Sequence, residues 1–245
     1  TSLRPTVDAF SYRLNVIPKR LTVAHYLTVF NRIQLGRYLA NTVVVSLAVT
    51  FVVLIVGTLA AYALIRMNFR GRNVVQALFL GARLLPIITA LVPLFIFVSK
   101  LKLLDTFAAL ILIHVAFKLP VTIWLMQGFI AAVPYELEEA AFLDGCNTRQ
   151  VLSRVIFPLV LPGLAASGII AFLFTWNDLI IALVLSSTIR TQPMSVGLTN
   201  FFLEHGIDWG PMSAAAVIML VPAFVFAFFA QRYLIQGLTA GAVKG

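Results

Sequence analysis

The sequence is poor in charged residues and in cysteine. Charged residues make up 11% of the 245 residues, and hydrophobic residues make up 61%. An ordinary soluble domain carries about 25% charged residues, so this composition predicts a polytopic membrane protein. The single cysteine, Cys146, excludes a disulfide within the chain and a metal cluster held by cysteines.

The sequence also lacks the motifs of common enzymes. His25, His114 and His205 lie far apart, and neither His-Glu-x-x-His nor Gly-x-Ser-x-Gly occurs. There is no Gly-x-x-x-x-Gly-Lys-Ser/Thr phosphate loop, so any ATP that drives the protein must bind to another chain. The net charge of +9 comes from scattered basic residues without an aromatic-interleaved basic face, which argues against nucleic-acid binding.

About five apolar runs are long enough for a membrane helix, which needs about 20 residues. They are residues 39–65, 74–98, 106–130, 159–185 and 212–235. Several runs contain proline, which predicts kinks. We therefore predict an all-α transmembrane bundle forming a single domain over residues 1–245. No internal repeat stands out, which weakens the alternative of a secondary transporter built from inverted repeats.

One polar stretch, residues 136–158, interrupts the apolar runs and must lie in water. Its three initial glutamates favour the start of a helix, and Asp144-Gly145 predicts the turn that ends it. Asn147, with Gln150 three residues later, is a variant of the capping box and predicts a second helix. The stretch is therefore predicted to form a helix-turn-helix segment.

Within this stretch a set of residues has a distinctive spacing: Glu139, Ala140, Ala141, Asp144, Gly145, Val155, Phe157 and Pro158. This set resembles the EAA motif of inner-membrane permease subunits of binding-protein-dependent ABC importers. Cys146 and Phe157 stand where alanine and leucine are usual, which does not alter the turn. Residues 174–178 and 231–245 resemble more narrowly the carbohydrate-uptake branch, in particular the maltose-transporter type of subunit with a C-terminal tail.

The resemblance implies a role for each part of the chain. Residues 134–157 would be a cytoplasmic segment that couples the chain to an ATPase subunit, and residues 1–37 would be extracytoplasmic. Glu139 would give a polar anchor, the alanines a close fit and Gly145 the turn, with Asp144 beside it. The tail, residues 236–245, would be cytoplasmic and would contact the ATPase through Thr239, Gly241 and Lys244. One further membrane span is expected upstream of Thr1.

The resemblance also implies partners. These are two ATPase subunits that bind ATP and Mg, a second and related permease subunit, and an extracytoplasmic solute-binding protein. The chain itself would bind no cofactor and no metal. We expect residues 186–211 to contact the solute-binding protein, the alternative being a solvated loop.

Polar residues within the apolar runs are candidates for the substrate pathway. Asn177 and Asp178 follow Trp176, and sugars are commonly held between an aromatic face and polar groups. The alternative is that these residues make hydrogen bonds between helices. Arg83 could pair with Asp178, meet an anionic substrate or face a water-filled cavity. For both Arg83 and Lys118, structural pairing is the simpler interpretation.

We therefore predict a non-catalytic permease subunit of an ATP-driven importer in the inner membrane of a prokaryote. It would move a disaccharide or oligosaccharide by alternating access. Glycerol phosphate or an acidic sugar is the alternative substrate, and an ATP-independent channel or secondary transporter is the alternative mechanism.

Overall fold

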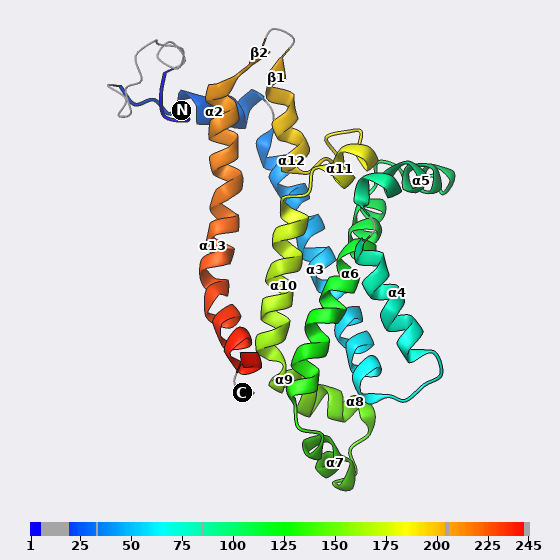
Figure 1. Ribbon diagram of the computed structural model, residues 1–245. Coiled ribbons are helices and arrows are strands. Elements are labelled where there is room, and N and C mark those ends of the chain that lie inside the picture. Colours follow the sequence, from blue (N-terminus) through cyan, green and yellow to red (C-terminus); the bar gives the residue numbers. More distant parts are fainter. Residues whose placement is uncertain (6–19, 33, 85, 204–205, 243–245) are drawn as a thin grey trace. The chain divides into compact units, whose positions relative to one another are not determined.

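The computed structural model is almost entirely helical (Figure 1). It describes residues 1–5, 20–32, 34–84, 86–203 and 206–242, with side chains at all of these except 32, 83, 202–203, 206–207 and 229–242. Three helices are long and apolar enough to cross a membrane: α3 (Leu35–Arg66), α6 (Phe107–Ala132), and Trp209–Phe228 within α13 (Trp209–Ala242). They confirm three of the predicted runs.

The other two predicted runs are interrupted. The first forms α4 (Arg72–Leu84) and α5 (Ile87–Lys100), and Pro86 stands between them. The other is the run over residues 159–185. Near its start the chain bends by 76°, between the segment Thr148–Leu159 and α10 (Leu161–Trp176). Counting each pair as one span gives up to five spans in the described residues.

Helix α10 ends at Trp176, which corrects the predicted continuous run over residues 159–185. A separate short helix, α11 (Ile180–Leu185), follows. The carboxylate Oδ1 of Asp178 accepts a hydrogen bond of 2.9 Å from the backbone N–H of Ile181, in the first turn of α11. A side chain that satisfies a free N–H at a helix start favours a new helix at that point.

The chain folds as two compact units. Unit 1 comprises residues 1–45, 93–110 and 176–225, and unit 2 comprises residues 46–92, 111–175 and 226–245. Helices α3, α5, α6 and α13 each contribute residues to both units.

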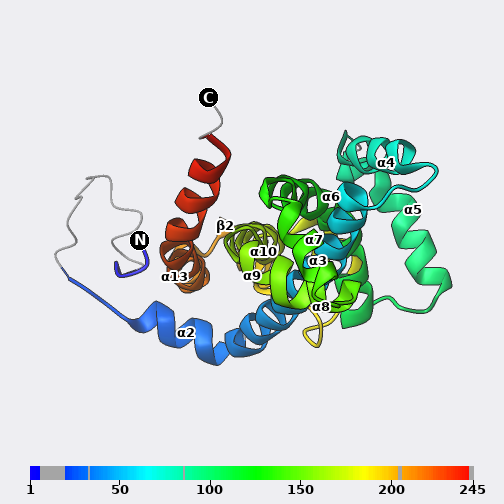
Figure 2. The ribbon, with the colours of Figure 1, turned by 90° about the horizontal axis from the view of Figure 1, so that it is seen from below.

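In unit 2, parts of α3, α6 and α10 lie side by side (Figures 1 and 2). Glycines allow their close approach: a Cβ added at Gly57 of α3 would lie 2.8 Å from the Cγ2 of Thr122 in α6. A Cβ at Gly163 of α10 would lie even closer to the ring of Phe129 in α6. Small residues at helix contacts are typical of membrane bundles, where close packing drives association.

The core of unit 2 joins α3 and α6 to the segment that follows α7 (Glu136–Leu143). That segment consists of α8 (Thr148–Val151), the π-helical turn η1 (Leu152–Ile156) and α9 (Phe157–Leu159). The buried members of this core are Ala61, Tyr62, Leu64, Ile123, Met126, Ile130, Val133, Val151, Ile156 and Val160. The polar stretch is therefore packed against its own bundle and is not a loose loop.

Unit 1 contains α2 (Ala24–Arg32), α11, α12 (Met194–Gly197), the 3₁₀ turn η2 (Leu198–Phe201) and a two-stranded antiparallel sheet. The strands are β1 (Phe202–Leu203) and β2 (Gly206–Ile207). The Asn41 amide donates hydrogen bonds to the carbonyls of Ile189 and Gln192. These bonds hold the segment before α12 against the start of α3, so residues 186–211 contain ordered structure.

Candidate functional site

The polar stretch forms the predicted helix-turn-helix, α7 to α8, and its turn is a Schellman motif. Gly145 has φ +86°, a left-handed conformation that favours glycine. Its N–H donates to the carbonyl of Phe142, and the N–H of Cys146 donates to the carbonyl of Ala141. These two bonds satisfy carbonyls that the end of α7 would otherwise leave free.

The second helix begins at the predicted capping box. The N–H of Gln150 donates to Oδ1 of Asn147 at 3.0 Å, and the N–H of Asn147 donates to Oε1 of Gln150 at 2.8 Å. Both bonds use residues three positions apart, so the helix start is fixed locally.

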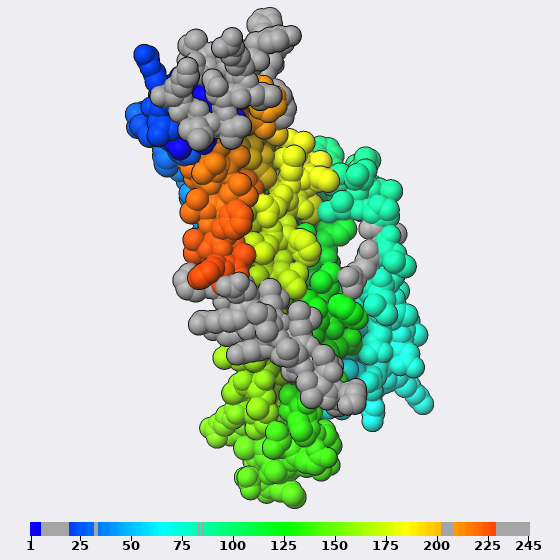
Figure 3. All heavy atoms as spheres, turned by 60° about the vertical axis from the view of Figure 1, so that its left-hand side comes forward, coloured from blue at the N-terminus to red at the C-terminus, as the bar shows by residue number. Residues whose placement is uncertain are grey.

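Helix α7 has an exposed face and a buried face. Glu139 and Ala140 are exposed, as are Asp144 and Gly145 in the turn. Ala141 is half-buried and packs against the core of unit 2. Figure 3 shows the green atoms of this segment standing at the end of unit 2. Four of the five predicted coupling residues are thus accessible to another chain, whereas Ala141 serves packing.

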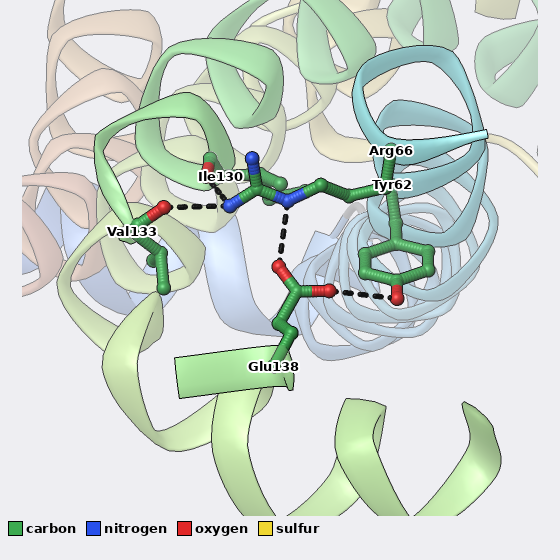
Figure 4. A network of polar contacts seen from close by, with 5 residues as sticks. All are labelled: Tyr62, Arg66, Ile130, Val133 and Glu138. Carbon is green, nitrogen blue, oxygen red and sulfur yellow. Dashed lines mark hydrogen bonds and ion pairs between the residues drawn. The ribbon is translucent and has the colours of Figure 1, made fainter. Parts of the chain in front are cut away.

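The buried face of α7 carries Glu138, which is 0% exposed. Its Oε1 forms an ion pair of 2.6 Å with Nε of Arg66, the last residue of α3. Its Oε2 accepts a hydrogen bond of 2.9 Å from the hydroxyl of Tyr62, one turn earlier (Figure 4). Both oxygens of the carboxylate therefore have partners on α3.

Arg66 also reaches the end of α6. Its Nη2 donates to the carbonyl of Ile130 at 3.1 Å and to that of Val133 at 2.6 Å (Figure 4). Arg66 therefore joins the ends of α3 and α6 to α7 through one side chain. A buried charge is stable only when it is paired and hydrogen-bonded, and here both charges are.

Sequence reasoning missed Glu138, because Glu136, Glu138 and Glu139 look alike as residues of a polar first turn. The sequence alone does not single it out, and the structure shows how it differs from the other two. Glu138 lies three residues before Ala141, and positions three apart share one face of a helix. Ala141 packs against the core, so that face points inward and its carboxylate needs a buried cation.

Three of the predicted pathway residues, Trp176, Asn177 and Asp178, lie in unit 1, at the break after α10. Trp176 is 1% exposed, and its indole Nε1 donates to the carbonyl of Met219 at 3.1 Å. The backbone carbonyl of Asp178 accepts from the hydroxyl of Ser195 at 2.7 Å. Asn177 is exposed and lines a pocket of about 460 Å³. The Trp176 indole thus bonds α10 to α13, and Asn177 lines a pocket, so a role in the substrate pathway stays a prediction for these residues.

Except for Lys118, the remaining predicted residues have side chains outside the described part of the chain. For Arg83 this concerns the side chain, since its backbone belongs to α4. Thr239 and Gly241 belong to the last turns of α13, where side chains are not described, and Lys244 follows the end of the description. Lys118 is half-buried, and its Nζ lies 5.8 Å from the ring centroid of Phe174.

A second carboxylate network lies in unit 1, between α5 and α6. Asp105 accepts hydrogen bonds from the backbone N–H groups of Ser187 and Thr188 and from the hydroxyls of Thr188 and Thr191. Burial alone would raise the pKa of Asp105, but these hydrogen bonds outweigh it and lower the pKa to about 2. Asp105 therefore fastens the segment after α11 as a charged group.

The described residues contain no group of three or more His, Cys, Asp or Glu side chains that could hold a metal ion.

The geometry can now be compared with known proteins. A family model described as "Binding-protein-dependent transport system inner membrane component" matches residues 53–240. The chain belongs to this family. Its match covers most of the chain, including α7 and the turn at Gly145.

Two relatives of this permease are transport proteins for small sugars. The trehalose transport system permease protein SugB of Mycobacterium tuberculosis is 34% identical over 100% of this chain and 89% of its own length. The diacetylchitobiose uptake system permease protein DasC of Streptomyces coelicolor is 33% identical, also over 100% of this chain and 89% of its own length.

A solved structure has the same fold. It belongs to a bacterial ABC transporter involved in the import of the acidic polysaccharide alginate, and it covers 95% of this chain and 86% of its own chain with a TM-score of 0.82. The sequence identity is 22%, so the likeness concerns the fold alone. The role follows from the family: the permease is an inner-membrane component of a binding-protein-dependent transport system.

Proposed function

We propose that this permease is the non-catalytic membrane subunit of an ATP-driven importer for a disaccharide or oligosaccharide. The observation that carries the proposal is the two-faced helix α7. Its outer face and glycine turn are exposed, while Glu138 ties its inner face to α3 and α6. A partner that pushes on the outer face would therefore move two membrane helices together.

In this proposal the pushing partners are two ATPase subunits, which bind ATP and Mg. Glu139, Ala140, Asp144 and Gly145 form the contact surface, and the described residues offer no metal site of their own. Residues 134–157 and 236–245 face the cytoplasm, and residues 1–37 face outward. A second permease subunit completes the pathway.

The substrate class rests on the relatives that act on trehalose and diacetylchitobiose. An extracytoplasmic binding protein delivers the sugar to the outer face, where residues 186–211 form the contact. ATP binding opens the pathway outward, and hydrolysis resets it. In both states α7 stays bonded to α3 and, through Arg66, to the end of α6. The ATPase cycle therefore moves these helices.

The test is co-purification. The chain is expressed with its partner permease and ATPase, and wild type is compared with Glu139→Lys and Gly145→Trp. Glu139→Lys changes an exposed position and should leave the bundle folded, whereas Gly145→Trp also strains the left-handed turn that presents this surface. In both variants the ATPase should be lost, or its hydrolysis should no longer respond to loaded binding protein. Lys100→Glu is the control, because it reverses an exposed charge at the end of α5, outside the coupling segment.

Two results would refute the proposal. One is an ATPase that never associates while solute still crosses, which would indicate a channel or secondary transporter. The other is an ATPase that still associates, and whose hydrolysis still responds fully to loaded binding protein, in both Glu139→Lys and Gly145→Trp.

A further inference from the structure

We propose that Gln76, Trp124 and Gln127 form a binding site for one ring of a neutral carbohydrate on this subunit. The inference rests on the proposed function and deepens it, because it places the substrate on this chain and decides between a neutral and a charged solute. No residue of this site was among the predicted pathway residues.

The site is a pocket of about 270 Å³ in unit 2, between α3, α4 and α6. Ligand pockets commonly measure about 300–1,000 Å³, so this one suits a single sugar ring better than a whole oligosaccharide. Gln76 and Leu80 line it from α4, and Trp124 and Gln127 line it from α6. Each pair is three or four residues apart, so both members share one helix face.

Gln127 supplies the observation that calls for a ligand. Its amide Nε2 is buried and makes no hydrogen bond within the described residues. A buried donor without a partner costs free energy, and the cost is greatest within a membrane, where water is scarce. A hydroxyl group in the pocket would accept this hydrogen bond, and a second amide, that of Gln76, lines the same pocket.

Trp124 supplies the flat apolar surface. It is 51% exposed although it lies within a membrane helix, α6. The C–H face of a sugar packs on an aromatic ring, while amides bond its hydroxyls, which is the usual division of roles in carbohydrate recognition. In contrast to Trp176, this indole remains accessible.

The charge of the lining decides the substrate class. None of the described residues that line the pocket is charged. Among the described lining residues a phosphate or carboxylate would find no cation to replace its hydration, which is unfavourable in a low-dielectric site. The pocket therefore fits a neutral sugar and disfavours glycerol phosphate and acidic sugars.

The test is substrate protection of an introduced thiol in the whole transporter, reconstituted in lipid nanodiscs. Leu80→Cys places a thiol in the pocket, in a Cys146→Ser background. Leu78→Cys, on the same helix and 67% exposed but outside the lining, is the matched control. Trehalose, maltose, diacetylchitobiose and glycerol 3-phosphate are the probes.

We expect a neutral sugar to slow thiol labelling at position 80 and not at position 78, with no protection by glycerol 3-phosphate. Adding Gln127→Leu should raise the half-protecting sugar concentration about tenfold, the effect of one lost hydrogen bond. Gln76→Leu should act in the same direction, and Trp209→Leu, an exposed tryptophan outside the pocket, should not.

The inference is overturned if no sugar that the transporter carries protects position 80, or if the charged probe protects it better. In either case the ATPase still associates and sugar is still transported, so the proposed function stands. Failure of the proposed function looks different, because then ATPase association and sugar transport are both absent.

Discussion

Two carboxylates, Glu138 in unit 2 and Asp105 in unit 1, fasten polar segments to the bundle in different ways. Glu138 is fully buried and bonds an arginine and a tyrosine. Asp105 is partly exposed and bonds only uncharged donors, namely backbone N–H groups and threonine hydroxyls. The first is an ion pair whose carboxylate is fully buried, and the second is a single charge held by hydrogen bonds from uncharged groups.

This difference predicts how much stability each segment loses when its carboxylate is replaced. Removing one member of a buried ion pair leaves the other charge buried without a partner, which costs much stability. Removing a charge that is bonded only by neutral donors costs less, because water can replace the lost hydrogen bonds. Helix α7 is therefore held by a buried ion pair, and the segment after α11 is held by hydrogen bonds from uncharged donors. The first kind of attachment suits a helix that passes on force from an ATPase, as proposed for α7.

The largest expected effect comes from Glu138→Ala. It strands the Arg66 guanidinium, whose side chain is 13% exposed, and should cost about 3–5 kcal/mol of stability. Thermal unfolding of the detergent-solubilised complex measures it. Glu139→Ala, one residue further and exposed, should change stability by less than about 0.5 kcal/mol. Equal losses of stability in Glu138→Ala and Glu139→Ala would show that the buried ion pair contributes no more to stability than an exposed glutamate.

Asp105→Asn should have a smaller effect, about 1–2 kcal/mol, because charge-assisted hydrogen bonds become neutral ones. Asparagine keeps the shape and tolerates the left-handed backbone of this position, where φ is +57°. Thiol accessibility in an Ile189→Cys variant, at a half-buried position of the fastened segment, should rise together with the loss of stability. An unchanged labelling rate would mean that Asp105 does not hold the segment.

Acid should reproduce part of the Asp105 effect. The pKa of Asp105 is about 2, below its ordinary value of 3.8, so its stabilisation is complete above about pH 4 and is lost as the pH falls through 2. Because the group is partly exposed, we expect a loss of about 1 kcal/mol at most. The stability difference between wild type and Asp105→Asn should shrink from pH 4 to pH 2. A constant difference over this range would contradict the lowered pKa.

The smallest effect is expected for Tyr62→Phe. It removes one hydrogen bond of 2.9 Å to Glu138 and leaves the ion pair intact, so the cost should be about 0.5–1 kcal/mol. In a Glu138→Ala background the same substitution should cost almost nothing, because its partner is gone. Strict additivity in this double-mutant cycle would argue that the two residues act independently.

Features that depend on neighbouring residues could be predicted from the sequence. Asp144-Gly145 predicted the turn, and Asn147 with Gln150 predicted the capping box, since all their partners lie within five positions. The long apolar runs likewise predicted α3, α6 and α13. The end of α10 at Trp176 was missed, because an apolar run does not show where a single Asp178 side chain starts a new helix.

The sequence by itself determined that this chain is a helical membrane protein with one exposed helix-turn-helix, because hydrophobic length and local hydrogen bonds need no distant partner. Only the tertiary structure decided which glutamate of α7 faces inward. Glu138 meets partners 72 and 76 positions away, and Asp105 meets Thr188 across 83 positions. Adjacent residues of a helix point in different directions, and only the packing of α3 and α6 decides which of those directions is buried.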